Sequence, residues 1–219
     1  MRLFGISPAD DEPFKGRGGR LPFRFVAELL VVFIGVYGAF WAEGYWQRLE
    51  DRETEETILG ALGAELENLA ENGPVVRDGM ALALAEHDEA LARGDRPLPP
   101  YYREPGAETP STSVWRATLS SGGVNLLDPE LFFSLAEFYN RVESTADRYI
   151  RYNTVTEREI LPLLSRGPDA FYDPGTGELD PKYGVHMDHL RTLRNEVSCI
   201  VARADTLRGR VLAELERIR

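Results

Sequence analysis

The histidines come closest to a pattern that could do chemistry. His186 and His189 lie three residues apart, so on a helix their ring nitrogens would share one face, as in some zinc sites. No third ligand follows at a fixed spacing, and Asp188 between them equally fits a polar helix start among solvated side chains. We therefore predict no metal site, and we expect the pair to be solvated.

Motifs for nucleophilic, phosphate or metal chemistry are missing. The chain has no Gly-x-Ser-x-Gly elbow, no Gly-x-x-x-x-Gly-Lys loop and no His-Glu-x-x-His helix. No base stands beside Ser120–Gly123, and pairs such as Glu65 and Glu67 do not stand out among 36 acidic residues. The one cysteine, Cys199, is expected to be a small core residue. The sequence predicts no catalytic residue and no cofactor; a hydrolase with an unrecognised carboxylate or histidine site is a third hypothesis.

The net charge argues against a nucleic-acid partner. The chain has 36 acidic and 25 basic residues and a formal charge of -11, so its field would oppose phosphate groups. Its 219 residues are 43% hydrophobic, which is enough for a compact core.

The most informative segment lies near the N-terminus. The 18 residues 25–42 contain one side chain that is charged at neutral pH, Glu28. At about 1.5 Å per residue they would span roughly 27 Å of hydrocarbon. The segment lacks the amphipathic pattern of a buried core helix and the small residues of a signal-peptide cleavage site. We therefore predict an uncleaved, single-pass signal anchor that lies in the lipid bilayer.

Charges on either side of this segment predict its orientation. Four basic residues stand close before it with no acid among them: Lys15, Arg17, Arg20 and Arg24. Six acids follow within residues 43–56. The N-terminus should therefore lie in the cytoplasm and the remainder outside it. Aromatic side chains would form an interfacial belt on the outer side, namely Trp41, Tyr45 and Trp46.

Small residues mark one face of the predicted membrane helix. They recur at positions i, i+3, i+4 and i+7, namely Gly35, Gly38, Ala39 and Ala42. Earlier turns of the same face hold Val31 and Glu28. Because small residues let another backbone approach, we predict contact with an integral membrane complex or in a homodimer. For Glu28 three roles stay open: pairing with Arg24 near the headgroups, contact with a partner helix, or proton transfer.

The remaining chain shows mainly helical periodicity. Residues 50–57 contain no apolar side chain and read as a solvated stalk. We expect a helix that ends at Asn72–Pro74, then further elements in this order: a helix over 75–93, a proline-rich loop over 97–112, a helix from Asp128 to about 160, a turn-rich loop over 169–182 and a helix over 190–218.

This pattern predicts an all-α fold, an N-terminal single transmembrane helix with a stalk followed by an antiparallel helical bundle. The expected parts are a cytoplasmic segment over 1–24, a transmembrane helix over 25–46, a stalk over 47–57 and an extracytoplasmic bundle over 58–219. The heptads of the last helix would pack into the bundle core or form an intermolecular coiled coil.

Aromatic and basic residues could line a groove for a partner or a small ligand. The candidates are Trp115, Arg116, Tyr139, Tyr149, Arg151 and Tyr152. Ordinary helix packing, with the guanidinium at the rim, would use the same residue types.

Two patches carry a resemblance. The first comprises Glu28–Val32, Gly35-Val36, Ala39, Trp46, Arg48, Arg52 and leucines 59, 62 and 66. The second comprises Trp115-Arg116, Leu119, Ser121-Gly122, Leu126-Leu127 and Pro129-Glu130-Leu131. In these the chain resembles a family of bacterial single-pass membrane proteins of unknown function with a helical extracytoplasmic domain, although Tyr45 stands where that family often has Asn. The resemblance implies the bacterial inner (cytoplasmic) membrane and a periplasmic domain, and it supplies no catalytic residue.

We therefore expect a non-enzymatic accessory or scaffold subunit. It would dock through its transmembrane helix to a larger respiratory, transport or photosynthetic complex. The alternative is an anchored extracytoplasmic module that binds a ligand or acts as a sensor.

Overall fold

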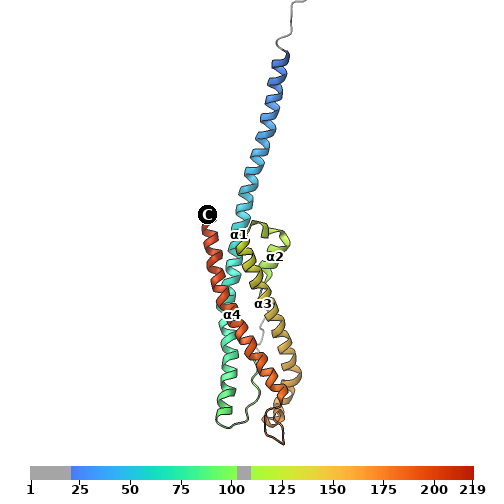
Figure 1. Ribbon diagram of the computed structural model, residues 1–219, viewed down its shortest axis with the longest axis vertical. Helices are drawn as coiled ribbons and strands as arrows, with labels where there is room; N and C mark the ends of the chain where they lie inside the picture. The colour runs from blue at the N-terminus through green and yellow to red at the C-terminus, as the bar shows by residue number, and fades with distance from the viewer. Residues whose placement is uncertain (1–20, 103–109) are drawn as a thin grey trace, which may run out of the picture. The chain divides into compact units, whose positions relative to one another are not determined.

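The computed structural model describes residues 21–102 and 110–219, with side chains from Glu28 onward. It contains four α-helices: α1 (Leu21–Ala92), α2 (Ser113–Ser121), α3 (Pro129–Val155) and α4 (Pro181–Ile218) (Figure 1). Short 3-10 or π turns connect them, namely η1 (Gly123–Leu126), η2 (Thr156–Ile160), η3 (Leu161–Arg166) and η4 (Pro168–Phe171). The described residues hold no β-strand beyond one isolated bridge, Tyr172 to Leu179, which confirms the all-α prediction.

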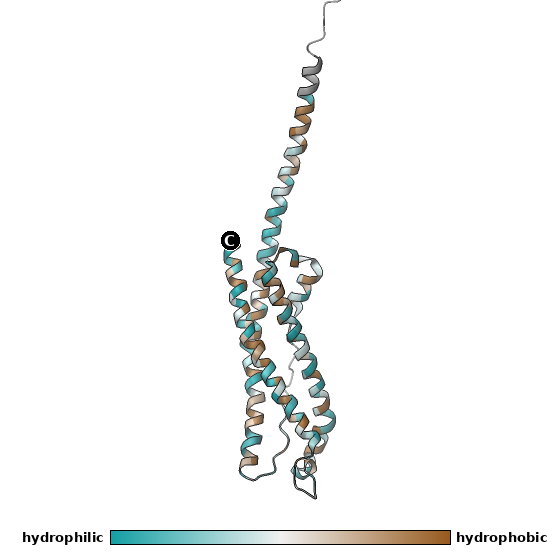
Figure 2. Cartoon of the chain, in the orientation of Figure 1, coloured by the Kyte–Doolittle hydropathy of each residue, from teal (hydrophilic) through white to brown (hydrophobic). Residues whose placement is uncertain are grey.

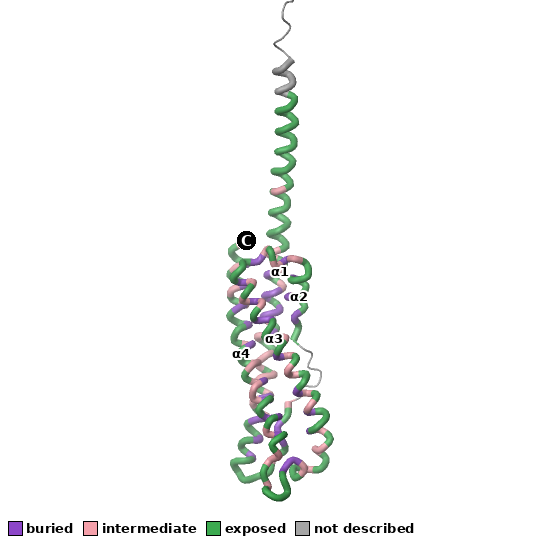
Figure 3. Tube along the Cα trace, turned by 45° about the vertical axis from the view of Figure 1, so that its right-hand side comes forward, coloured by how far each residue is buried: buried purple, intermediate pink, exposed green. Residues whose placement is uncertain are grey.

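The chain divides into two compact units after Glu50. The first contains the apolar part of α1, the one helix among the described residues that is long and apolar enough to cross a membrane. Figure 2 shows its apolar residues in brown, and Figure 3 shows that they are exposed. Val31 is 70% exposed and Trp41 is 73% exposed. The predicted cytoplasmic segment, 1–24, lies outside the described side chains.

The predicted helix end at Asn72–Pro74 is wrong, because α1 continues through Pro74 to Ala92. Proline removes one backbone hydrogen bond and crowds the preceding turn, which normally stops a helix. Here the buried apolar face of α1 resumes beyond it, with Met80 and Leu84. Packing of that face on other helices outweighs the local cost of the proline.

The second unit is built around α1, α3 and α4. Within it, α1 and α3 run in the same direction and α4 runs opposite to both (Figure 1). The three helices contribute to one core, which includes Leu59, Leu62 and Leu66 from α1, Leu135, Phe138 and Val142 from α3, and Ala204, Leu207 and Val211 from α4. The heptad face of α4 is thus buried within the chain, as the intramolecular interpretation expects.

Local sequence signals explain where α3 and the turn-rich loop lie. Asp128 Oδ1 accepts from the backbone N–H of Leu131 at 2.9 Å, so it caps α3 as its position before Pro129 predicts. The loop folds back on Asp173, whose Oδ1 accepts from the N–H groups of Gly175 and Thr176 at 2.7 and 2.8 Å. Both signals are confirmed; only the last turn before Pro162 changes from α to π and 3-10 geometry.

Two leucines of α1 test this core. Leu62 is fully buried, whereas Leu82 is 60% exposed. Leu62→Ala should lower the free energy of unfolding by about 2–5 kcal/mol, because it leaves a cavity. The control Leu82→Ala should change it by less than about 0.5 kcal/mol. Urea unfolding of the full chain in nanodiscs measures both, and equal losses would contradict the described core.

Candidate functional site

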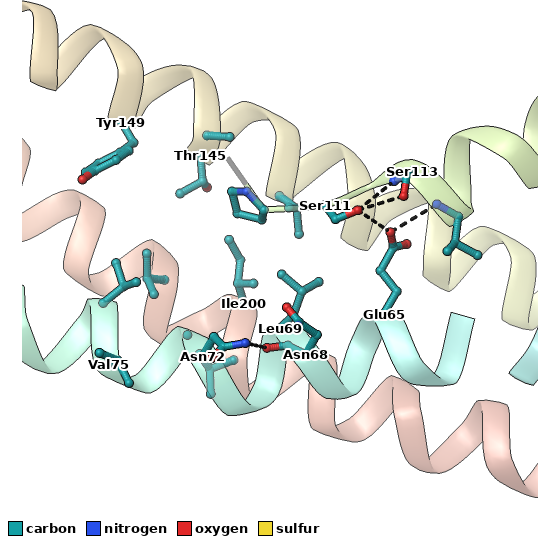
Figure 4. Close-up of a pocket in the computed structure, with 18 of the residues that line it drawn as sticks. Glu65, Asn68, Leu69, Asn72, Val75, Ser111, Ser113, Thr145, Tyr149 and Ile200 are labelled. Atoms are coloured by element: carbon teal, nitrogen blue, oxygen red, sulfur yellow. Dashed lines mark hydrogen bonds between the residues drawn. The ribbon is translucent and has the colours of Figure 1, made fainter. Parts of the chain in front are cut away.

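A cavity of about 840 Å³ lies in the second unit, lined by α1, the residues just before and at the start of α2, α3 and α4 (Figure 4). Its apolar lining includes Leu69, Met80, Val142, Leu193, Val197 and Ile200. Asn68 and Asn72 line it from the exposed face of α1. Exposed residues such as Asn68 and Asn72 among its walls show that the cavity opens to the surface, and small-molecule sites commonly measure about 300–1,000 Å³. The cavity is therefore the candidate binding site.

Glu65 lies at one end of the cavity and Tyr149 at the other (Figure 4). Glu65 is 7% exposed, and four donors point at its carboxylate. Oε1 accepts from Ser111 Oγ and from the N–H of Val114, each at 3.2 Å. Oε2 accepts from the N–H of Trp115 at 3.4 Å and from the Tyr139 hydroxyl at 2.9 Å.

These contacts make Glu65 the cap of α2. The residue before that helix, Thr112, makes no side-chain capping bond of its own. The Glu65 carboxylate instead meets the free N–H groups and the positive end of α2. Burial, and then the charge of and hydrogen bond to Glu65, raise the pKa of Tyr139 far above its usual value, so its hydroxyl stays a donor. A carboxylate with all its acceptor sites engaged serves structure and is not placed to act as a general base.

The predicted groove residues do not share an open groove. Trp115 and Tyr139 are buried and stack with ring centroids 5.1 Å apart. Arg116 is exposed and donates from Nε to Glu143 Oε1 at 2.9 Å. Tyr152 is buried in a separate cluster with Met80. Ordinary helix packing accounts for these four residues. Of the other two candidates, Arg151 is exposed and Tyr149 lines the cavity.

His186 is buried, and the expectation of a solvated residue is wrong for it. The helix α4 starts at Pro181, so His186 lies one turn before Leu190 on the buried face. Its ring stacks on Tyr152 with centroids 4.5 Å apart, while Nδ1 has no hydrogen-bond partner. Burial first, and then the charge of His189, lower the pKa of His186 to about 4. His189 itself is exposed, as predicted.

Cys199 is exposed, which corrects its placement in the core. The neighbouring Ile200 occupies the buried position, and consecutive helical residues point about 100° apart. Within the ranges that the structure describes, no group of three or more His, Cys, Asp or Glu residues could hold a metal ion.

The predicted membrane-facing residues all lie on the uncovered part of α1. Val31, Ala39 and Ala42 are exposed, and a Cβ added at Gly35 or Gly38 would meet no atom within 4 Å. In the aromatic belt, Tyr45 lies with its ring centroid 6.3 Å from that of Trp41 and 6.3 Å from that of Trp46. The proposed pairing of Glu28 with Arg24 lies outside the described side chains.

Sequence reasoning named one lining residue, Tyr149, as a groove candidate and missed the cavity itself. Its walls come from separate helices, and their distances do not follow from periodicity within each helix. A partial signal exists on α1, where Ala61, Ala64, Asn68 and Asn72 recur at helical spacing and are too short or too polar to fill an apolar core.

No protein-family model, no curated protein and no solved structure matches the chain. The family resemblance therefore stays a prediction, and function must be argued from the residues themselves.

Glu65→Gln tests the cap. The amide would place donors against the donors that now meet the carboxylate, so the free energy of unfolding should fall by about 1.5–3 kcal/mol. The control Glu71→Gln changes an exposed residue of the same helix and should shift it by less than about 0.5 kcal/mol. Chemical unfolding followed by circular dichroism measures both free energies. Equal values for the two variants would contradict the assignment of Glu65 as the cap of α2.

Acidification tests the buried histidine. The pKa of His186 is about 4 in the folded protein and 6.5 when unperturbed. The contribution of the neutral ring to the free energy of unfolding is therefore complete above pH 6.5 and is lost as the pH falls toward 4. At about 1.4 kcal/mol per pKa unit, the gap corresponds to at most about 3.5 kcal/mol. His186→Phe should therefore flatten the loss of unfolding free energy between pH 6.5 and 4, and His189→Phe should not. An unchanged slope in His186→Phe would refute the assignment.

Proposed function

We propose that this chain is a single-pass membrane protein that serves as an accessory or scaffold subunit of a larger membrane complex. The observation that carries the proposal is the exposure of the apolar N-terminal part of α1: none of that segment is buried by protein. Water contact costs about 25 cal/mol per Å² of apolar surface, so the segment requires a nonpolar surrounding. A bilayer supplies it, whereas a soluble core helix would be buried by its own chain.

The proposed topology follows the charges around this helix. Residues 1–24 would lie in the cytoplasm and 25–46 would cross the bacterial inner membrane. The polar stretch 47–57 would form the stalk, and 58–219 an extracytoplasmic antiparallel bundle. The core shared by α1, α3 and α4 supports a bundle, with α1 and α3 each antiparallel to α4.

The proposed docking face is the small-residue side of the membrane helix. It consists of Glu28, Val31, Gly35, Gly38, Ala39 and Ala42. The open space around Gly35 and Gly38 supports it, because no described side chain lies within 4 Å of a Cβ added at either position. A larger integral membrane complex is the preferred partner, and a second copy of the chain is the alternative.

Replacement of Gly35 and Gly38 by Leu tests this face. The added side chains should block close helix contact, so the double variant should lose its membrane partners in a mild-detergent pull-down. Gly44→Leu is the matched control, because Gly44 lies about two and a half turns beyond Gly35, on the opposite side of the helix. It should retain the partners.

Partners retained by the double variant at the level of the control would disprove docking through this face. Equal insertion of all variants into the membrane fraction is checked in the same samples.

An anchored ligand-binding module is the second candidate, and the cavity of about 840 Å³ favours it. The helical unit would then bind a small molecule, and a membrane partner would transmit or use the bound state. Both candidates are binding functions and neither needs a catalytic residue.

A further inference from the structure

The apolar interior of the second unit is divided into separate clusters. The largest, here called the proximal core, includes Leu62 of α1, Leu135 of α3 and Leu207 of α4. A smaller one, here called the distal core, consists of Met80, Leu84, Tyr152, Leu190 and Leu193. The two clusters share no buried residue. Because parts of a protein with separate cores can open independently, the distal core can open while the proximal core stays packed.

His186 joins the distal core to the end of α3 and the start of α4. Its ring is 3% exposed and stacks on Tyr152 with 4.5 Å between the ring centroids. The Tyr152 hydroxyl accepts from the backbone N–H of Tyr102 at 3.3 Å, so the segment that follows α1 is attached to the same ring. Displacement of His186 would therefore loosen the contacts of three segments at once.

The hydrogen bonds around His186 define its neutral form. The Thr156 hydroxyl donates to the carbonyl oxygen of Tyr152 at 3.0 Å, so it can only accept from His186 Nε2, which lies at 3.5 Å. Nε2 therefore carries the ring proton. Nδ1 is buried and has no partner. A second proton would place an N–H group there without an acceptor and a positive charge without a counter-ion, which is strongly unfavourable.

The elements packed around His186 offer no counter-ion. Their acidic groups are exposed or have other partners: Asp88 and Asp188 pair with Arg191, Asp95 with Arg93, Asp169 with Arg96, Glu159 with Arg158 and Asp180 with Lys182, and Glu86, Glu89 and Glu157 are exposed. The other titratable groups are histidines and phenols, which carry no negative charge at acidic pH, namely His87, His189, Tyr101, Tyr102, Tyr149, Tyr152 and Tyr183.

We infer that His186, with its contacts to Tyr152 and Thr156, is an acid-sensitive latch: protonation of its ring releases the start of α4 from α3 and opens the distal core, while the proximal core stays folded. The inference goes beyond the proposed function, because it adds regulation by proton concentration. It does not depend on the side of the membrane on which the second unit lies.

The two pKa values of His186 set the size of the effect. The pKa is about 4 in the packed state and 6.5 for an unperturbed ring, so the open state binds the proton more tightly and acid favours opening. These values predict that the equilibrium constant for opening rises about 60-fold between pH 7 and pH 4.5.

Hydrogen–deuterium exchange of the full chain in nanodiscs tests the inference. Peptides are compared at pH 7 and pH 4.5 after correction for the intrinsic exchange rate. We expect exchange to accelerate by up to about 60-fold in residues 80–84, 149–156 and 186–193, which contain the distal core and the latch. Exchange in 59–66, 135–142 and 204–211, which contain the proximal core, should not change.

Two variants and one control assign the effect to His186. His186→Phe keeps an aromatic ring beside Tyr152 and cannot be protonated, so protection of the distal peptides should persist at pH 4.5. His186→Gln also cannot be protonated and provides the test if His186→Phe fails to fold. His189→Phe changes an exposed residue of the same helix, and it should lose distal protection like the natural chain.

Three results would overturn the inference. They are full protection of the distal peptides in the natural chain at pH 4.5, equal loss of protection in the proximal core at that pH, and acid-induced loss that persists in the His186 variants. Because the exchange is measured within the second unit, these results are independent of docking in the membrane, which the glycine variants test separately.

Discussion

The rest of the structure depends on one constraint, namely that the apolar side chains of α1 must be shielded from water. Along one helix, side chains such as Val31 have no protein around them, whereas Leu62 is fully buried by α3 and α4. The change occurs across the stretch 50–57, which has no apolar side chain. A single helix thus has one part whose apolar side chains are exposed and one part whose apolar side chains are buried by protein. In the proposed topology, lipid covers the first part.

Within the second unit, hydrogen bonds to the buried carboxylate of Glu65 hold α1, α2 and α3 together in addition to apolar packing. Glu65 reaches from α1 to the first turn of α2 and to Tyr139 on α3. Its buried position is tolerated because each of its acceptor sites is used. The contact also fixes one end of the cavity, so the fold and the candidate site share a residue. This explains why a carboxylate beside a cavity need not indicate acid–base catalysis.

The sequence predicts elements better than it predicts their contacts. Helical periodicity locates α4, and the Asp128 cap locates the start of α3, because both signals are local. Pro74 misleads, since local backbone chemistry is outweighed by packing on distant residues. His186 and Cys199 are misplaced because their exposure depends on where α4 begins and which face it buries. The cavity escapes prediction for the same reason: it exists only between helices.

The most direct test of the account uses Cys199, the one cysteine of the chain, which is exposed in the helical unit. Intact spheroplasts that carry the protein are treated with a membrane-impermeant maleimide, and the labelled chain is quantified before and after lysis. If 25–46 anchors the helical unit outside the cytoplasm, Cys199 reacts fully without lysis, and Cys199→Ser gives no signal. Reaction of Cys199 only after lysis would contradict the proposed topology and with it the extracytoplasmic role of the helical unit.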